Sequence, residues 1–266
     1  MIEPAPRILS REYYERLKAV EEQHPWARAM RGLALDLLRE GNAGAAPPVL
    51  LDAGCGAGLF LCEYEKEFNG AVVTGFDLSL DGLRVAQNRG LRRLASASAA
   101  ELPFPGGEFD VVVCHDVLQH LTPGEAMRAV QEFARVLRPG GRLLLRTAAR
   151  RGLFGKKHLD TPDYRQWAPE QLSEALIEHG FVVEFLARVN WLPGLLADLK
   201  ALARPRPQGD IGLELDPQSG SGWKGRMLRA YWSLERRLVL RTPWRPGHGH
   251  TLFCLASKPR MNPHAC

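Results

Sequence analysis

The chain has 266 residues, a formal net charge of +5 and 45% hydrophobic residues. That length fits one large domain with an extension, and that apolar fraction is typical of a packed core, which excludes disordered, collagen-like and coiled-coil proteins. The longest apolar runs, such as FDVVVC at 109–114, are far shorter than the roughly 20 residues that cross a bilayer. The N-terminal stretch MIEPAPRILSRE also lacks the apolar region of a signal peptide, so we expect a soluble protein of the cytoplasm.

The cysteines form no CxxC pair and no metal-like cluster. An odd number of cysteines in a chain of this size argues against a disulfide framework. We therefore interpret them as reduced thiols. They are Cys55, Cys62, Cys114, Cys254 and Cys266.

The first elements are helices, because residues 10–40 place Trp26, Met30 and Leu33 at helical spacing. We expect residues 1–47 to form an N-terminal helical cap.

From residue 48 to about 187, short apolar runs alternate with helical patterns, which is typical of βαβ units around a parallel sheet. The predicted strands cover 48–53, 71–76, 91–95, 110–115, 141–147, 181–187 and 251–257. The predicted helices between them cover 58–67, 80–89, 123–137 and 169–179. The sequence thus predicts an α/β fold with a Rossmann-like, mostly parallel sheet and helices on both faces.

An insertion interrupts this pattern before the last predicted strand. Residues 191–248 hold two helical patterns around a Pro-, Gly- and Ser-rich stretch at 205–222, which we interpret as a mobile loop in a helical lid. The core is then 48–190 together with 249–260. The second helical pattern mixes aromatic, aliphatic and basic residues, which suits peripheral contact with an anionic membrane or an acidic substrate. The alternative is a core-packing helix with solvated arginines.

Alternating glycines follow the first strand, in the order Asp52-x-Gly54-x-Gly56-x-Gly58. Glycine permits positive φ and close approach of a ligand to the backbone. The G-x-G-x-x-G pyrophosphate fingerprint would require glycine at position 59, where the chain has leucine. Asp77 ends the next strand, where an acid can accept both ribose hydroxyls of a nucleoside. These residues indicate a nucleoside site without a pyrophosphate; a tight turn without a ligand is the alternative.

Four segments carry a family resemblance, namely VLLDAGCGAGLF, FDLS, ELPFPGGEFDVVV and RVLRPGGRLLL, in that order. They resemble the successive motifs of class I S-adenosylmethionine-dependent methyltransferases, in the type 11-like branch. The resemblance implies a seven-stranded sheet that ends in an antiparallel hairpin. It also implies S-adenosylmethionine as the cofactor and S-adenosylhomocysteine as its product.

The same resemblance assigns the cofactor residues. It implies that Asp52 and the turn glycines surround the methionine moiety, that Asp77 binds the ribose and that Leu78 lies against the adenine. Where the family often has an acid for the adenine amino group, this chain has a serine, whose hydroxyl or following backbone takes that role. The expected cofactor-binding residues are Asp52, Gly54, Cys55, Gly56, Gly58, Asp77, Leu78, Ser98, Ala99 and His115.

Methyl transfer from a sulfonium is an in-line displacement, so the enzyme aligns the acceptor and removes a proton where the acceptor needs it. His115 and His120 follow the fourth strand and are the catalytic candidates, because neutral imidazole suits a general base; a structural role is the alternative for each. This stretch also resembles the E-x-x-E-H metal motif of some ubiquinone-pathway O-methyltransferases. Gln119 replaces a carboxylate of that motif, so we expect no metal.

The segments RRGLFGKKHLDTPDYRQWAPEQLSEAL at 150–176 and GFVVEFLARVNWLPG at 180–194 resemble a methyltransferase branch associated with envelope polysaccharide, lipid or natural-product pathways. The resemblance implies an acceptor pocket with His158, Tyr164, Arg165 and Asn190. The segment at 114–117 lacks the Asn/Asp-Pro-Pro-aromatic pattern of amino-methylating nucleic-acid enzymes, so we expect no DNA acceptor. The leading hypothesis is O-methylation of a small-molecule, lipid-linked or sugar-linked acceptor. The alternatives are an RNA-modifying methyltransferase, favoured only by the basic C-terminal quarter, and a non-catalytic S-adenosylmethionine-binding protein.

Overall fold

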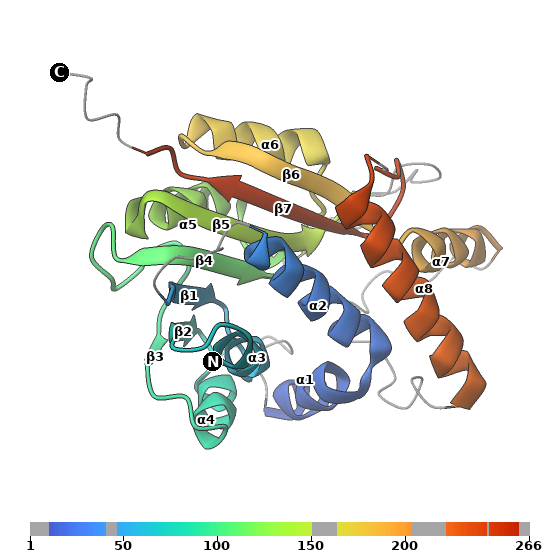
Figure 1. Ribbon diagram of the computed structural model, residues 1–266, viewed down its shortest axis with the longest axis horizontal. Helices are drawn as coiled ribbons and strands as arrows, with labels where there is room; N and C mark the ends of the chain where they lie inside the picture. Colours follow the sequence, from blue (N-terminus) through green and yellow to red (C-terminus); the bar gives the residue numbers. More distant parts are fainter. Residues whose placement is uncertain (1–10, 41–46, 151–163, 204–221, 244, 261–266) are drawn as a thin grey trace, which may run out of the picture.

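The computed structural model describes residues 11–40, 47–150, 164–203, 222–243 and 245–260 (Figure 1). One seven-stranded sheet runs through them in the order β3-β2-β1-β4-β5-β7-β6. The strands are β1 (Val49–Ala53), β2 (Val72–Asp77), β3 (Leu94–Ser96), β4 (Phe109–His115), β5 (Leu137–Ala148), β6 (Val182–Val189) and β7 (Thr251–Ser257). Strands β1 to β5 pair in parallel, whereas β7 is antiparallel to β5 and β6. The predicted α/β class and the antiparallel hairpin at the end of the sheet are confirmed.

Helices cover both faces of this sheet, as predicted. They are α1 (Arg11–Gln23), α2 (Pro25–Arg39), α3 (Leu59–Glu67), α4 (Leu80–Asn88), α5 (Pro123–Val136), α6 (Pro169–Glu178), α7 (Trp191–Ala203) and α8 (Gly222–Arg241), with a 3-10 turn at Leu118–His120. Because β6 is antiparallel to β7, it is parallel to β5, and its carboxyl end lies at the same edge as those of β1 to β5. That edge also holds the start of α7.

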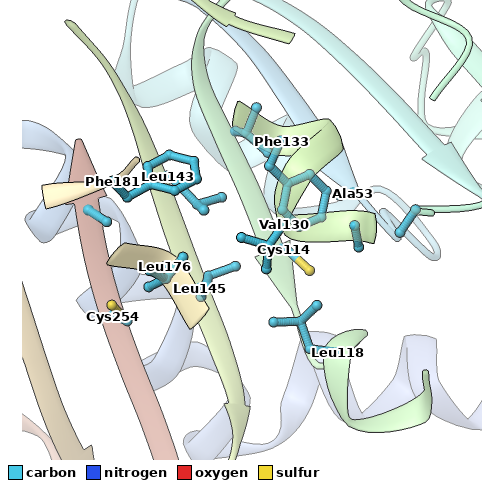
Figure 2. Close-up of a cluster of buried hydrophobic side chains, with 14 of the residues drawn as sticks. Ala53, Cys114, Leu118, Val130, Phe133, Leu143, Leu145, Leu176, Phe181 and Cys254 are labelled. Atoms are coloured by element: carbon cyan, nitrogen blue, oxygen red, sulfur yellow. The ribbon is translucent and has the colours of Figure 1, made fainter. Parts of the chain in front are cut away.

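Side chains alternate between two cores because successive residues of a strand point to opposite faces. In the first core, Phe133 of α5 and Leu176 of α6 pack on strand residues that include Cys114 and Leu145 (Figure 2). The second core lies under α2, α3 and α8, where Leu144 and Phe253 face Tyr64, Trp232 and other buried side chains. The strand sequences predict that both faces are buried, because they are nearly continuous apolar runs and do not alternate between apolar and polar residues.

Two strands begin three or more residues away from their predicted starts, whereas the other predicted boundaries lie within two residues of the observed ones. Strand β5 begins at Leu137 rather than at position 141, because Phe109 pairs with Leu137 before the register shifts at Val111. The Pro139-Gly140-Gly141 signal thus lies inside a strand, and helix α5 ends just before it, at Val136. Strand β3 begins at Leu94 rather than at 91, because Leu91 is buried beneath the glycine turn instead. The predicted mobile loop at 205–222 lies outside the described residues apart from position 222.

Helix α8 is held against α2, as Figure 1 shows. Arg236 forms an ion pair with Asp36 of α2, and its guanidinium lies over Gly32, where a Cβ would meet Nη1 at 2.6 Å. The indole of Trp232 is buried in the second core. The insertion is therefore anchored to the N-terminal helices as well as to the sheet.

Glu235 is the polar centre of this anchor and is 3% exposed. Its carboxylate accepts hydrogen bonds from the backbone N–H of Asn190 (3.1 Å), the backbone N–H of Trp191 (2.8 Å) and the Tyr231 hydroxyl (2.7 Å). The Asn190 side chain donates to Thr251 Oγ1 at 2.8 Å and accepts from Trp232 Nε1 at 3.0 Å. This network joins β6, α7, α8 and β7.

We predict that Glu235→Ala lowers the free energy of unfolding by at least about 1–3 kcal/mol, because it leaves buried N–H donors without an acceptor. Chemical denaturation checks this value. Glu235→Gln keeps one acceptor oxygen and is the matched variant, which we expect to lose less stability. Equal stability of Glu235→Ala and the unsubstituted protein would show that the network contributes nothing.

Candidate active site

The glycine turn lies between β1 and α3 and has the expected left-handed backbone. Gly54 has φ +81°, and a Cβ there would lie 2.2 Å from Val117 Cγ2. Gly56 has φ +51°, and its nearest neighbour in the Cβ direction is Tyr14, at 3.7 Å. Protein packing thus requires glycine at position 54, whereas the turn has room beside Gly56. Cys55 is buried in the second core, so its side chain lies behind the turn.

Asp77 is buried at the end of β2 and connects three segments. Its Oδ1 accepts hydrogen bonds from the Tyr14 hydroxyl (3.0 Å) and the Ser79 backbone N–H (2.8 Å). Its Oδ2 accepts from the backbone N–H of Gly56 at 2.8 Å. A carboxylate has about four lone-pair positions, so these donors leave it able to accept at least one more hydrogen bond.

Helix α1 covers this turn with two tyrosines whose rings are perpendicular, with centroids 5.4 Å apart. Burial, and then the Asp77 charge, raise the pKa of Tyr14 far above its usual range, so its hydroxyl stays protonated and donates. Burial, and then Asp116, raise the pKa of Tyr13 to about 12. Neither tyrosine titrates near neutral pH.

Two carboxyl groups are desolvated beside the turn. Burial raises the pKa of Asp52 to about 8, and Glu21 and Asp77 add repulsion. Burial also raises the pKa of Glu21 to about 7, against the attraction of Arg31, Arg89 and Arg146. Asp52 Oδ1 and Glu21 Oε2 are both buried and accept no hydrogen bond from any described residue. A cation or a hydrogen-bond donor would satisfy both groups.

We predict that Asp52→Asn raises the melting temperature of the cofactor-free protein, and more at pH 8 than at pH 5. The folded-state pKa of Asp52 lies above the ordinary value of 3.8, so the folded state binds the proton more tightly than the unfolded state. Stability of the unsubstituted protein therefore falls as the pH rises from about 4 to about 8, and a neutral amide avoids that loss.

Differential scanning fluorimetry at the two pH values measures this effect. Each kcal/mol corresponds to about 2–4 °C in a protein of about this size. A melting temperature that is the same for both proteins at both pH values would contradict the desolvation of Asp52.

His115 ends β4 with its ring 4.7 Å from that of Phe60, in an edge-on contact. Its Nε2 is buried and has no hydrogen-bond partner among the described residues. Burial, and then the charges of Arg146 and Arg31, lower the pKa of His115 well below its usual range. The imidazole is therefore neutral at physiological pH.

Arg146 and Asp116 form an ion pair next to His115. Asp116 has φ +58° and accepts from Arg146 Nε (3.0 Å) and Nη2 (2.5 Å), while its backbone N–H donates to the Arg146 carbonyl. The Arg146 guanidinium also lies 5.5 Å from the ring centroid of Trp26. Helix α2 thus contacts the Arg146–Asp116 pair through Trp26.

His120 and two predicted acceptor residues lie together. The rings of His120 and Tyr164 are 5.7 Å apart, and the backbone N–H of Arg165 donates to the Gln119 carbonyl at 2.7 Å. The Gln119 side chain accepts from the backbone N–H of Ala148 at 2.7 Å. His158, the third predicted residue of this pocket, lies outside the described residues. The fourth, Asn190, is engaged in the Glu235 network.

The other end of the turn offers an apolar surface. Leu78, directly after Asp77, is 57% exposed, and Ala99 is buried three residues after Ser96, the partner of Asp77 in the sheet. Ser98 Oγ accepts from the backbone N–H of Ala100 at 3.2 Å, which leaves its hydroxyl proton free to be donated.

Sequence reasoning missed the residues that the N-terminal helices bring to this site. They are Tyr13, Tyr14, Glu21 and Arg31, and the last forms an ion pair with Glu63 of α3 at 2.8 Å. The sequence offered one signal for them, namely polar residues on the side of the amphipathic pattern at 10–40 that is expected to be buried.

Comparisons with known proteins identify the family. The family model described as "Methyltransferase domain" matches residues 51–145. The ubiquinone biosynthesis O-methyltransferase of Azoarcus sp. (strain BH72) is 32% identical over 192 residues, which are 65% of this chain and 79% of that protein. The chain belongs to the class I S-adenosylmethionine-dependent methyltransferases. The family expected from the motifs is thereby confirmed.

Further relatives match over shorter stretches or in fold alone. The Klebsiella pneumoniae (strain 342) enzyme of the same name is 30% identical over 129 residues, and this chain spans half of its length. Phosphoethanolamine N-methyltransferase 2 of Haemonchus contortus, solved with S-adenosyl-L-methionine, has a TM-score of 0.61 at 20% identity over 95% of this chain and 59% of that one. A chain of the Haloferax volcanii complex of Trm112 with a methyltransferase has a TM-score of 0.59 at 18% identity, over 97% of this chain and 99% of that one.

The methyltransferase uses S-adenosylmethionine, and its residues fit this cofactor. The unpartnered Oδ1 of Asp52 suits an ammonium group, the exposed Leu78 suits a flat base, and Asp77 can accept a further hydroxyl. Within the described ranges, no three His, Cys, Asp or Glu side chains are grouped as a metal site would require. None of the described helices has the length and hydropathy to cross a membrane.

Proposed function

We propose that this methyltransferase methylates a hydroxyl oxygen of a small-molecule, lipid-linked or sugar-linked acceptor in a natural-product or envelope pathway. The relative from Azoarcus, named as an O-methyltransferase, supports oxygen as the methylated atom. The observation that carries the proposal is the position of His120, half-buried against Tyr164 at the edge where the parallel strands end. An alcohol or phenol acceptor needs a proton acceptor at such a position.

The cofactor has a place at the glycine turn in this proposal. Asp52 holds the ammonium group, Asp77 binds the ribose hydroxyls and Leu78 packs on the adenine, whose amino group meets Ser98 or the backbone of Ala99. Arg31 pairs with the cofactor carboxylate. Gly54, Cys55, Gly56 and Gly58 would hold the methionine moiety, and His115 would contribute a neutral side chain to the same site. When bound, S-adenosylmethionine supplies an electrophilic methyl group on a sulfonium.

The two histidines take different roles. The Nε2 atom of His115 is buried, and desolvation together with two arginines lowers the pKa of this imidazole, so it serves as a neutral hydrogen-bonding group. His120 is half-buried and reaches solvent, so it can accept the acceptor's proton and release it. Tyr164 and Arg165 then position the acceptor. This division assigns proton removal to His120.

We predict that Asp77→Ala weakens S-adenosylhomocysteine binding by about 1.5–3 kcal/mol for each lost charged hydrogen bond. Isothermal titration calorimetry measures this change. Because Asp77 also holds Tyr14, the matched control is Tyr14→Phe, which removes the internal hydrogen bond and keeps the carboxylate. We expect Tyr14→Phe to bind at least as tightly as the unsubstituted enzyme. Unchanged affinity in a folded Asp77→Ala protein would contradict the ribose assignment.

We predict that His120→Ala lowers kcat by roughly 10²–10⁴ while cofactor affinity stays unchanged, because the proton acceptor is lost. The assay follows S-adenosylhomocysteine formation by mass spectrometry with a panel of phenols and alcohols, each paired with its amine analogue. Turnover of the hydroxyl members and not of the amines is the expected pattern. Full turnover by both His120→Ala and His115→Ala on the best acceptor would mean that alignment alone suffices.

A further inference from the structure

We propose that the outward face of α8, together with the start of α7, is a docking surface for a membrane that contains anionic lipids. This surface consists of Trp223, Met227, Leu234, Lys224, Arg226, Arg237 and Arg241 of α8 and the exposed apolar residues of α7. The proposal concerns binding of the folded chain to a lipid surface, and it holds whether or not the acceptor assigned above is correct.

The outward face of α8 carries exposed apolar side chains, whereas a helix that only packs on a core has polar side chains on its outward face. Trp223, Met227 and Leu234 are 61%, 62% and 57% exposed. Their spacing of four and then seven residues places them on one side of the helix. Trp232 and Val239 face the second core from the opposite side, so the burial of α8 is already satisfied. The exposed side chains are therefore additional to the packing that the fold requires.

The same face is strongly basic. Arg237 and Arg241 follow Leu234 by three and seven residues, so they continue the outward stripe. Apart from Arg236, α8 has five basic residues, and all five are exposed. Arg236 is paired with Asp36. The one acid of α8, Glu235, is buried in its own network. Every residue of α8 lies within the described range, so no acid of this helix offsets the charge.

Aromatic and basic groups are interleaved on this face as an interface helix requires. The Lys224 ammonium lies 5.8 Å from the ring centroid of Trp223. Indole rings favour the level of the lipid headgroups, and lysine and arginine bury their stems while their charges stay with the phosphates. A helix with this pattern lies in the plane of the interface, and its binding energy combines apolar burial with attraction to anionic lipid.

A second apolar stripe lies on α7. Trp191, Leu192, Leu196 and Leu199 are exposed. The backbone N–H of Leu192 donates to the Tyr231 hydroxyl at 3.0 Å, so α7 begins against the middle of α8. Figure 1 shows both helices at the right of the molecule, on the side opposite β3. Because α7 starts at the carboxyl edge of the sheet, the docked membrane would lie near the acceptor side of the site.

The test is flotation of the full chain with two kinds of vesicle, pure phosphatidylcholine and phosphatidylcholine mixed with phosphatidylglycerol. We expect binding to the mixed vesicles, weakened by added salt. Lys224→Glu combined with Arg226→Glu should reduce that binding by at least about tenfold, since each basic residue near an anionic surface contributes appreciably. Trp223→Ser combined with Met227→Ser should abolish the binding that persists at high salt.

The matched control is Arg92→Glu combined with Arg93→Glu, which makes the same change in net charge on exposed residues next to β3, at the opposite edge of the sheet. S-adenosylhomocysteine binding by all variants verifies that they fold. The proposal is overturned if the mixed vesicles do not float the protein or if the control variant loses as much binding as the α8 variant. It is also overturned if the α8 residues are needed for binding RNA in a gel-shift assay and not for binding vesicles.

Discussion

Asp77 holds the site together because its carboxylate accepts three hydrogen bonds from three different segments. Its carboxylate binds the glycine turn through Gly56, the start of α4 through Ser79 and the N-terminal helix through Tyr14. The turn therefore has a defined position relative to β2 before any ligand arrives. Preorganisation of this kind reduces the entropy that binding must overcome. The same contact connects α1 to the glycine turn, so the N-terminal helix and the turn share one carboxylate.

The sheet and the cofactor turn were predictable because local patterns determine them. Glycines at 54 and 58 have positive φ and no space for a Cβ, and buried apolar runs specify β1, β2 and β4. The start of β5 was not predictable, because Pro139-Gly140-Gly141 reads as a helix stop and only the pairing with Phe109 extends the strand. The N-terminal contribution was missed for a similar reason. Nothing local to Glu21 indicates that it will lie beside Asp52.

The charges around the turn oppose stability and favour ligand binding. Asp52 and Glu21 are desolvated carboxyls. Arg146 attracts both of them and Arg31 attracts Glu21, and the same two arginines lower the pKa of His115. Burying such groups costs free energy unless each finds a partner. A zwitterion such as the methionine end of the cofactor carries both signs and would offset both costs. A site that is electrostatically incomplete by itself is thus expected to gain stability when its ligand binds.

Helix α2 contacts both the region of the glycine turn and helix α8 of the insertion. One part of it presents Arg31 to Glu63 of α3, next to the cofactor turn, and another pairs Asp36 with Arg236 of α8. Trp26 at its start lies over Arg146, beside His115. These three contacts belong to one helix, so α8 and the side chains that border the site share the same support. The insertion is therefore connected through α2 to residues that border the active site, although α8 contributes none of the residues assigned to the cofactor.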